Sequence, residues 1–413
     1  MSPGARPGRR VLLLTTSYPA APDDTAGIFV QGFAETLVAL GYSVDVVAPA
    51  LLPSVAQPRE HAADVPSRGP GNARETPRVT RLAYARPASL QRTFHRAGAP
   101  ENLRADPLAW LGALTYPLAL GRYLLQHASA FDVLVSHWAV PSAYTATLLP
   151  ERSRPRHVVV THGADIHLLE HVPGGARLAR RIARHSSAIT FVSAGHRARF
   201  EALVGHALAQ ASVLAMGVEL APSLLDRRQA RAALGLEGPV LLTLGRLVPI
   251  KGLDVLIQAL RDVPEVTLVI AGAGPSREKL ERLARQHRVR VRFPGVVLGQ
   301  DKTAWLRAAD AFVLPSRRLA SGREEGTPTA LLEAMLAGLP AIASDTGGVA
   351  EALCDGELGV LVPPDDPSAL RAAVDELLAD PAAAQARARS AKQAAEAQTW
   401  SALGPRLDAL VRG

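Results

Sequence analysis

Two cations follow the apolar run Val240–Leu244 at a spacing that suits an anionic ligand. Arg246 offers a planar guanidinium fork, and Lys251 offers a compact ammonium group. Both side chains would come from one loop between a strand and a helix, so together they could bind one diphosphate. The pattern is not a P-loop, since G-x-x-x-x-G-K-[ST] is absent. Taken alone, two solvated surface cations are the more common interpretation.

Two carboxylates flank the start of a predicted helix farther along the chain. The run Glu325-Gly326-Thr327-Pro328 leads into an apolar segment that contains Glu333. Thr327 is a favoured N-cap residue and Pro328 suits the first helical position, so we expect the helix to begin there. A helix N-terminus favours an anion, and carboxylates accept hydrogen bonds from sugar or ribose hydroxyls. The alternative is a capped helix with solvated glutamates, but Glu333 interrupts an otherwise apolar run.

These groups need a scaffold that brings the ends of several strands together. Short apolar runs alternate with helical patterns along the chain, for example at Val11–Thr15, Ser43–Ala48, Val266–Ala271 and Ala311–Leu314. This alternation predicts parallel sheets covered by helices on both faces. We expect an α/β chain with two Rossmann-like domains facing each other, joined near residues 217–238. Ligands bind outside the carboxyl ends of the strands in such sheets.

The combination of motifs resembles the retaining GT-B glycosyltransferases of family 4. The resemblance spans essentially the whole chain and is densest in residues 240–365. There, Gly245–Gly252 and the segment Glu325–Glu351 (EGTPTALLEAMLAGLPAIASDTGGVAE) are similar to the family's donor-binding signature. Ser17–Pro49 is also similar to these enzymes. The resemblance implies the GT-B fold, in which a central cleft lies between the two domains.

The resemblance also implies roles for individual side chains. Arg246 and Lys251 would bind the diphosphate of a donor and stabilise charge on the leaving nucleotide. Glu325 would hold sugar hydroxyls, and Glu333 would hold the nucleotide ribose. No side chain is an evident nucleophile, so we expect transfer on the front face of the sugar.

The resemblance assigns backbone contacts to three further residues. Gly326 and Thr327 would supply N–H groups to the sugar or phosphate. Gly27 opens the first predicted helix and would let the backbone of that loop approach the phosphates. Family members often have an aromatic-Gly pair where this chain has Thr327-Pro328, and Pro328 has no N–H to donate.

The motif from His162 to Asp165 follows the predicted strand His157–Thr161 and resembles the family's His-Gly-x-Asp motif. His162 would face the donor sugar, where it would bond a hydroxyl or position the reacting centre. Asp165 would contribute to donor binding or orient the loop. A structural or solvated histidine is the equally weighted alternative. His137 and Trp138, after another predicted strand, would line the acceptor side or pack in the core.

Metal chemistry is not expected from this sequence. His167 and His171 are four residues apart but lack the zincin pattern, and the family generally works without a metal. Cys354 is the only cysteine, which excludes a disulfide framework and a multi-cysteine zinc site. The only further requirement would be the nucleotide-diphosphate sugar, as a co-substrate; no cofactor is expected.

The net charge of +8 is concentrated in residues 1–220, which hold 22 Arg and no Lys against 15 Asp and Glu. Such a half could face nucleic acid, an anionic membrane or an acidic small molecule. No aromatic residues are interleaved with the arginines, so we expect no nucleic acid partner. The basic helix predicted over Ala176–His185 presents either a solvated face or a contact with an anionic membrane or a lipid-diphosphate acceptor.

No uninterrupted apolar run reaches the ~18 residues of a membrane-spanning helix. Trp110–Leu125 is the nearest case, but Pro117 and Arg122 interrupt it. The run Val11–Leu14 is too short for a signal peptide and is interpreted as a buried first strand. We therefore expect a cytoplasmic protein, with a peripheral contact at the inner membrane face as a further expectation.

Together these features predict an enzyme that moves a sugar from a nucleotide-diphosphate sugar to a hydroxyl of a sugar or lipid-linked acceptor, in polysaccharide, glycolipid or glycoconjugate biosynthesis. Residues 1–218 would bind the acceptor and residues 219–395 the donor, while a helix in 396–413 would cross back to the first domain. Two alternatives stay open: a GT-B sugar-nucleotide epimerase, which needs no acceptor, and a catalytically silent nucleotide-sugar binder.

Overall fold

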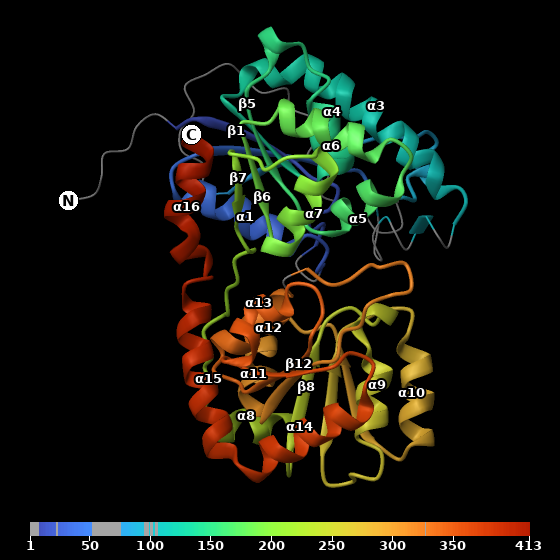
Figure 1. Ribbon diagram of the computed structural model, residues 1–413, viewed down its shortest axis with the longest axis vertical. Helices are drawn as coiled ribbons and strands as arrows, with labels where there is room; N and C mark the ends of the chain where they lie inside the picture. The colour runs from blue at the N-terminus through green and yellow to red at the C-terminus, as the bar shows by residue number, and fades with distance from the viewer. Residues whose placement is uncertain are drawn as a thin grey trace, which may run out of the picture. The chain divides into compact units, whose positions relative to one another are not determined.

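The computed structural model describes residues 8–21, 24–51, 76–94, 99, 102–103, 106–326 and 328–413. The chain forms two compact units, which we describe separately (Figure 1). Unit 1 contains residues up to Leu214 together with Leu403–Gly413, and unit 2 is Ala215–Ala402. Each unit is built on one sheet whose strands are all parallel, with helices on both faces. The predicted α/β fold class is therefore confirmed.

The sheet of unit 1 has the strand order β3-β2-β1-β4-β5-β6-β7. The chain thus starts in the middle, adds strands on one side, and then crosses to the other side between β1 and β4. Buried aliphatic side chains of β1 alternate between the two faces, with Leu12 and Leu14 in the same core cluster. The strands are β1 (Arg10–Leu14), β2 (Ser43–Pro49), β3 (Arg78–Leu82), β4 (Val133–His137), β5 (Arg156–Val160), β6 (Ala188–Phe191) and β7 (Ala211–Val213).

Helices cover this sheet and supply its two cores. Phe33 and Leu37 of α1 are buried, and Tyr116, Leu120 and Leu124 of α3 are buried as well. The helices are α1 (Ile28–Ala39), α3 (Ala109–His127), the short α4 (Tyr144–Ala146), α5 (Ala164–His171), α6 (Gly175–Arg184) and α7 (Ala194–Val204). None of the helices in the described ranges is both long and apolar enough to cross a bilayer.

The sheet of unit 2 has the order β10-β9-β8-β11-β12-β13, so it reverses between β8 and β11. Leu242 and Leu244 of β8 enter one core cluster and Leu241 enters the other, as alternation in a doubly covered strand requires. The strands are β8 (Val240–Leu244), β9 (Thr267–Ala271), β10 (Arg290–Gly295), β11 (Ala311–Leu314), β12 (Ala341–Ser344) and β13 (Val360–Val362). The helices are α8 (Arg227–Leu234), α9 (Leu253–Ala259), α10 (Arg277–Gln286), α11 (Gly299–Ala308), α12 (Thr329–Leu336), α13 (Val349–Ala352), α14 (Pro367–Ala379) and α15 (Pro381–Glu396).

The chain passes between the units twice, and the two connecting segments pair with each other. The Val218 N–H donates to the Gln398 carbonyl (2.9 Å), and Gly217 lies against the ring of Trp400. Helix α16 (Trp400–Arg412) then continues into unit 1. There the Tyr42 hydroxyl donates to Asp408 (2.7 Å).

Four elements were not predicted from the sequence: α5, α7, α8 and β7. β7 has only three residues, too few to show a periodicity. The start of α12 was predicted one residue too early. Pro328 is extended (φ −75°, ψ 115°) and is the N-cap, so Thr329 is the first helical residue. Thr327, the predicted N-cap, lies outside the described residues.

Candidate active site

The loops that follow β8 and β11 meet where the strand order of unit 2 reverses. Parallel α/β sheets bind ligands at this kind of position. The Arg317 N–H donates to the Ile250 carbonyl (2.9 Å), which ties the two loops together. Gly252 has φ 59°, and a Cβ there would overlap the Pro315 carbonyl oxygen. The loop that carries the predicted cations is therefore held against the neighbouring strand end by backbone contacts.

Lys251 and Glu325 form an ion pair in this region. The Lys251 Nζ lies 2.8 Å from the Glu325 Oε2, and both side chains are largely buried. Gly347 follows β12, and a Cβ there would overlap the Glu325 carbonyl oxygen. This close backbone contact fixes the position of Glu325 relative to the end of β12. The two residues lie 74 positions apart in sequence. Their pairing brings the cationic loop and the segment before α12 to one place.

Arg246 shares a small pocket with Lys251. The pocket is lined by residues of the β8 end and its loop, among them Thr243, Gly245, Arg246 and Lys251. Arg246 itself is exposed. The structure therefore gathers Arg246, Lys251 and Glu325 on one side of unit 2, with an exposed guanidinium beside a buried ammonium–carboxylate pair.

The loop after β9 packs against the loop that carries Arg246 and Lys251, which we call the cationic loop. The Leu247 N–H donates to the Ala273 carbonyl (2.9 Å), and the Ser276 N–H donates to the Leu247 carbonyl (3.0 Å). Gly272 adjoins the Gly245 carbonyl so closely that a Cβ would overlap it. These contacts leave the backbone around Arg246 few alternative conformations.

Glu333, about one turn into α12, is paired with a residue that the sequence analysis did not identify. The Lys302 Nζ, from α11, lies 2.8 Å from the Glu333 Oε1, and both side chains are largely buried. Burial raises the pKa of the Glu333 carboxyl, and the charge of Lys302 opposes that shift. Lys302 therefore favours the ionised form of this largely buried carboxyl, which is the form that accepts hydrogen bonds from hydroxyl groups.

The N-terminus of α12 lies between these two ion pairs in sequence. No side chain among the described residues caps it, and its N-cap Pro328 carries no N–H. The first helical N–H groups, at Thr329 and Ala330, have no intrahelical acceptor. Gly326 is half-buried directly before this turn. The arrangement can accept an anionic or hydroxyl oxygen at the helix start.

In unit 1, His162 follows β5 and is surrounded by rings. Its Nε2 lies 3.0 Å from the Nδ1 of His137, which ends β4. The rings of Phe29 and Trp138 lie 4.9 Å and 4.6 Å from the imidazole, centroid to centroid. Burial lowers the pKa of His162 to about 3 and also lowers that of His137. Both imidazoles are neutral at physiological pH, so one nitrogen of the bonded pair donates and the other accepts.

Asp165 is buried and holds two loops by their backbones. Its Oδ2 accepts from the Ala139 N–H (2.7 Å), and its Oδ1 accepts from the N–H groups of His162 (3.0 Å) and Ile166 (3.1 Å). Both carboxylate oxygens are thus engaged within unit 1. This geometry favours the orienting role of Asp165 over a direct contact with a ligand.

Gly27 is the N-cap of α1 and has φ 76°. A Cβ at Gly27 would overlap the Ser17 carbonyl, so the loop after β1 packs directly on the start of the helix. The glycine is therefore required by a contact inside the chain, whatever it adjoins on its outer side. Phe29 follows two residues later and reaches the His162 ring.

We expect unit 1 to lose stability as the pH falls below about 6.5. Burial lowers the pKa of His157 to about 4 and that of His162 to about 3, and it also lowers the pKa of His137. In the unfolded chain these imidazoles bind protons near pH 6.5. Between pH 6.5 and 4 the unfolded state therefore binds more protons, and the free energy of unfolding should fall by about 1.4 kcal/mol per pH unit for each histidine.

Denaturant titrations at several pH values measure this slope, and NMR titration of the imidazoles assigns it. The slope should decrease by about a third in His157→Gln, because one of three such groups is then removed. A free energy of unfolding that stays constant from pH 7 to pH 5 would contradict the prediction that these histidines are neutral in the folded protein.

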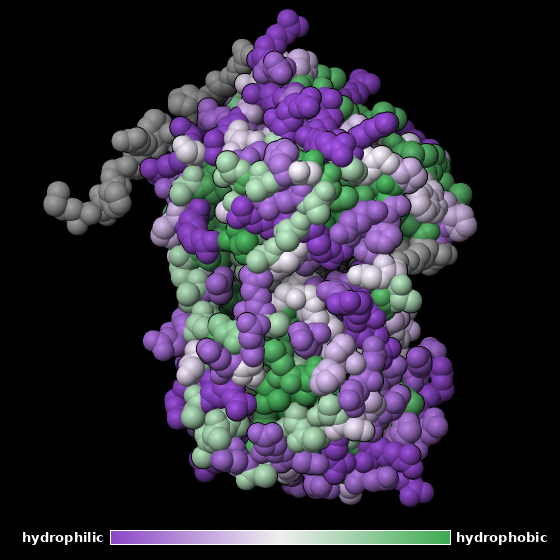
Figure 2. Space-filling view, viewed as in Figure 1, coloured by the Kyte–Doolittle hydropathy of each residue, from purple (hydrophilic) through white to green (hydrophobic). Residues whose placement is uncertain are grey.

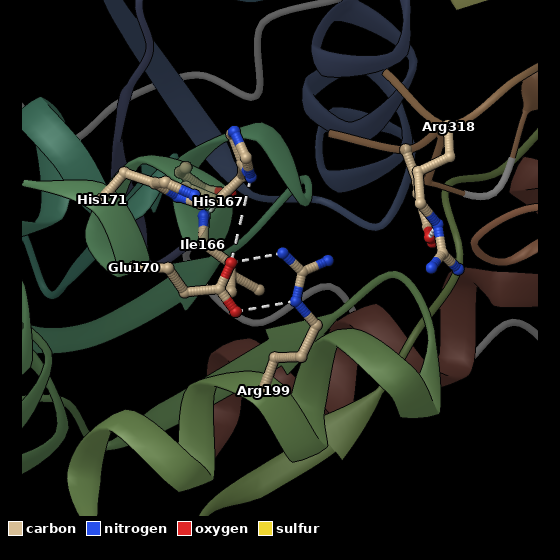
Figure 3. Close-up of polar contacts among 8 residues, drawn as sticks. Ile166, His167, Glu170, His171, Arg199 and Arg318 are labelled. Atoms are coloured by element: carbon tan, nitrogen blue, oxygen red, sulfur yellow. Dashed lines mark hydrogen bonds and ion pairs between the residues drawn. The ribbon is translucent and has the colours of Figure 1, made fainter. Parts of the chain in front are cut away.

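The structure places a carboxylate, that of Glu170, beside the histidine pair of α5, and the sequence analysis did not consider it as a metal ligand. His167, Glu170 and His171 lie close enough for their ligand atoms to fall within 4.8 Å of one another. Figure 3 shows, however, that the Glu170 carboxylate faces the Arg199 guanidinium, and Arg199 Nε donates to Glu170 Oε1 (2.8 Å). The second guanidinium nitrogen donates to Oε2. A metal cation bound to Glu170 would be repelled by the positive charge of Arg199. We therefore interpret the cluster as a Glu170–Arg199 ion pair rather than a metal site.

Known families match both halves of the chain. The model of glycosyl transferases group 1 matches residues 226–397, and the model of the glycosyl transferase 4-like domain matches residues 24–215. A GDP-mannose-dependent alpha-(1-6)-phosphatidylinositol monomannoside mannosyltransferase of Mycolicibacterium smegmatis is 35% identical over 67% of this chain and 75% of its own length. A glycogen synthase of Mycobacterium tuberculosis is 31% identical over 93% of this chain and 89% of its own.

Solved structures share the fold at lower identity. A sucrose-phosphate synthase from Thermosynechococcus elongatus superposes with a TM-score of 0.75 at 22% identity, over 98% of each chain. HepE of Anabaena, in complex with UDP, gives a TM-score of 0.72 at 19% identity, over 98% of this chain and 99% of its own. These similarities concern the fold alone. With the family models and relatives above 30% identity, they establish that the chain belongs to the group 1 glycosyl transferases and is a glycosyltransferase of the GT-B fold.

Proposed function

We propose that this enzyme transfers a sugar from a nucleotide-diphosphate sugar to an acceptor hydroxyl, with retention at the anomeric carbon. Unit 2 would bind the donor and unit 1 the acceptor. The observation that carries the proposal is the Lys251–Glu325 pair beside Arg246, at the point where the strand order of unit 2 reverses. Two cations and a carboxylate there fit a pyrophosphate linked to a polyhydroxylated ring. Relatives named as GDP-mannose-dependent, and fold neighbours solved with UDP, support this class of donor.

The chemical step needs no nucleophile from the protein. The bond from the anomeric carbon to the phosphate oxygen breaks as the acceptor oxygen bonds to the same face of that carbon. The proton of the acceptor hydroxyl passes to the departing phosphate oxygen. Negative charge grows on the diphosphate in this step, and Arg246 and Lys251 would stabilise it. Such preorganised charge is worth about 3 to 4 kcal/mol for each donor in other enzymes.

The other site residues would position the two substrates. Glu325, which is paired with Lys251, would accept hydrogen bonds from sugar hydroxyls, and Glu333 would accept from the ribose. Gly326 and Thr327 would place backbone groups near the sugar or phosphate. His162, whose neutral imidazole is bonded to His137, would offer one hydrogen bond from unit 1 to the donor sugar.

The acceptor in this proposal is a sugar or a lipid-linked molecule, and the enzyme makes a peripheral contact with an anionic membrane on its cytoplasmic side. Two relatives support these acceptor classes by name, one acting on a phosphatidylinositol mannoside and one assigned to teichuronic acid biosynthesis. The basic helix α6 supports the membrane contact, because Arg177, Arg180, Arg181 and Arg184 follow one another without an acidic residue. No nucleic acid partner is proposed.

A thermal-shift screen with UDP, GDP, ADP and their sugars tests the donor class, because a ligand that binds only the native state raises the melting temperature. Product analysis then separates the mechanisms. Transfer that requires an acceptor and keeps the anomeric configuration supports the proposal. Product formed without any acceptor would indicate a sugar-nucleotide epimerase, and binding without turnover on a broad acceptor panel would indicate a silent binder.

We expect Lys302→Met to weaken binding of a nucleoside diphosphate about tenfold. Without the ammonium group, burial keeps Glu333 protonated over a wider pH range, and a protonated carboxyl is a poorer acceptor for the ribose hydroxyls. The 2′,3′-dideoxy nucleotide lacks those hydroxyls, so its affinity should stay nearly unchanged. Calorimetry with both nucleotides measures the difference.

Two further variants control this experiment. Lys279→Met removes an exposed lysine from α10 of the same unit and should change neither affinity. Lys302→Arg keeps the positive charge and should restore most of the binding. Equal losses for the ribose and dideoxy nucleotides in Lys302→Met would show that the pair only stabilises the fold.

A further inference from the structure

Helix α3 of unit 1 has an apolar stripe on the side that does not pack against the sheet. Leu114, Leu118 and Leu125 are 70%, 73% and 67% exposed. Exposed side chains at spacings of three and four residues form one stripe along a helix. We call this stripe the outer face of α3, and it consists of Leu111, Leu114, Leu118, Arg122 and Leu125.

The composition of α3 is unusual for an exposed helix. Ala109–His127 contains no Asp or Glu, and Arg122 is its only Arg or Lys. Trp110, at its start, is 58% exposed. Solvated helix faces normally carry charged residues of both signs, and an exposed apolar stripe of this length marks an interaction surface.

Arginines of α6 adjoin the same region through α4. Gly121 of α3 lies near the Thr145 methyl group of α4, and Leu148, just beyond α4, is exposed. Arg181 of α6 donates to the Thr147 carbonyl (2.9 Å) and hydroxyl (3.0 Å). Figure 2 shows hydrophobic residues over α3 at the upper right of the view and hydrophilic residues beside them over α4 and α6. The apolar stripe and the basic helix therefore belong to one side of unit 1.

We propose that the outer face of α3 docks on the surface of an anionic lipid bilayer. The leucines would insert among the acyl chains. Arg122 and the exposed arginines of α6, which are Arg177, Arg180 and Arg184, would lie at the level of the lipid phosphates. Each cation near such a surface strengthens binding, and the effect weakens with added salt. This locates the membrane contact proposed above and does not depend on the donor or on the transfer step.

A second copy of the chain fits this surface less well. Two copies related by a twofold axis present the same patch to each other. Arg122 and the arginines of α6 would then face like charges, and neither α3 nor α6 offers a carboxylate to compensate them. A phosphate-rich bilayer supplies the missing negative charge.

Flotation of the full-length protein with vesicles tests the proposal. One set of vesicles is pure phosphatidylcholine and the other contains 30% phosphatidylglycerol. The wild type should bind the anionic vesicles and release at high salt. Leu114→Ser combined with Leu118→Ser should lower the partition coefficient at least about tenfold. Leu224→Ser is the matched control, because Leu224 is 80% exposed but lies in unit 2, and it should bind like the wild type.

The remaining measurements make every outcome informative. Turnover on a soluble acceptor should be the same in the double variant as in the wild type, which separates membrane docking from glycosyl transfer. Equal vesicle binding by the double variant and the wild type would overturn the proposal. A second outcome would also overturn it: the wild type binds neither kind of vesicle but forms a dimer at high protein concentration, and the double variant does not form that dimer.

Discussion

Replacing Lys251 by alanine should lower kcat about 100- to 1,000-fold, the range found when one preorganised transition-state donor is removed. The ammonium group lies 2.8 Å from Glu325 and beside Arg246, where the proposed leaving diphosphate gains charge. Its loss also leaves the Glu325 carboxylate largely buried without its partner, close to a substrate of the same sign. Arg246→Ala should reduce kcat about 100-fold.

Three controls separate charge stabilisation from local damage. Lys279→Ala removes an exposed lysine of α10 and should keep normal turnover. Circular dichroism and the melting temperature should show that Lys251→Ala remains folded. Lys251→Ala combined with Glu325→Gln should recover the part of the loss that comes from the unpaired carboxylate. Turnover near the wild-type value in both Lys251→Ala and Arg246→Ala would refute the proposed role of the cations.

Gly252→Ala should destabilise unit 2 by about 3 to 5 kcal/mol and abolish most activity. Gly252 has φ 59°, and its added Cβ would overlap the Pro315 carbonyl oxygen. The two backbones would have to separate, which would also displace Lys251 from Glu325. Chemical denaturation and steady-state kinetics measure the two effects.

Gly299 provides a matched comparison for this substitution. Its φ is 52°, almost the same as that of Gly252, but among the described residues no atom outside its chain neighbours and its own helix backbone lies within 4 Å of the position of its Cβ. Gly299→Ala should therefore cost only about 1 to 2 kcal/mol, the strain of the left-handed backbone, and should leave kcat unchanged. If both variants lose the same stability, the contact with Pro315 has no special importance.

The fold could be predicted because its strands are short, apolar and buried on both faces. β8 and β11 were predicted with the bounds that the structure shows. The cationic loop could be found as well, since Arg246 and Lys251 directly follow a strand. The start of α12 was less accurate, because Pro328 has the backbone φ of a helix but the ψ of an extended chain.

The partners of the site residues could not be predicted. Lys302 belongs to a different helix, and nothing in the local pattern of α11 distinguishes it from a solvated lysine. The bond between His137 and His162 depends on the adjacency of β4 and β5, in which His137 is paired with Val160. Asp165 was correctly placed near His162, but only the structure shows that three backbone N–H groups occupy its oxygens. Such pairings are set by sheet order rather than by sequence spacing.

The return of Leu403–Gly413 to unit 1 bears on how the enzyme is made. A ribosome must synthesise all of residues 215–402, which takes about 10 to 40 s at ordinary rates of translation, before the last helix of the first unit exists. Until then Tyr42 has no Asp408 to bond. Unit 2 can therefore complete its core before unit 1 does, although it follows most of unit 1 in sequence, because unit 1 also needs Leu403–Gly413.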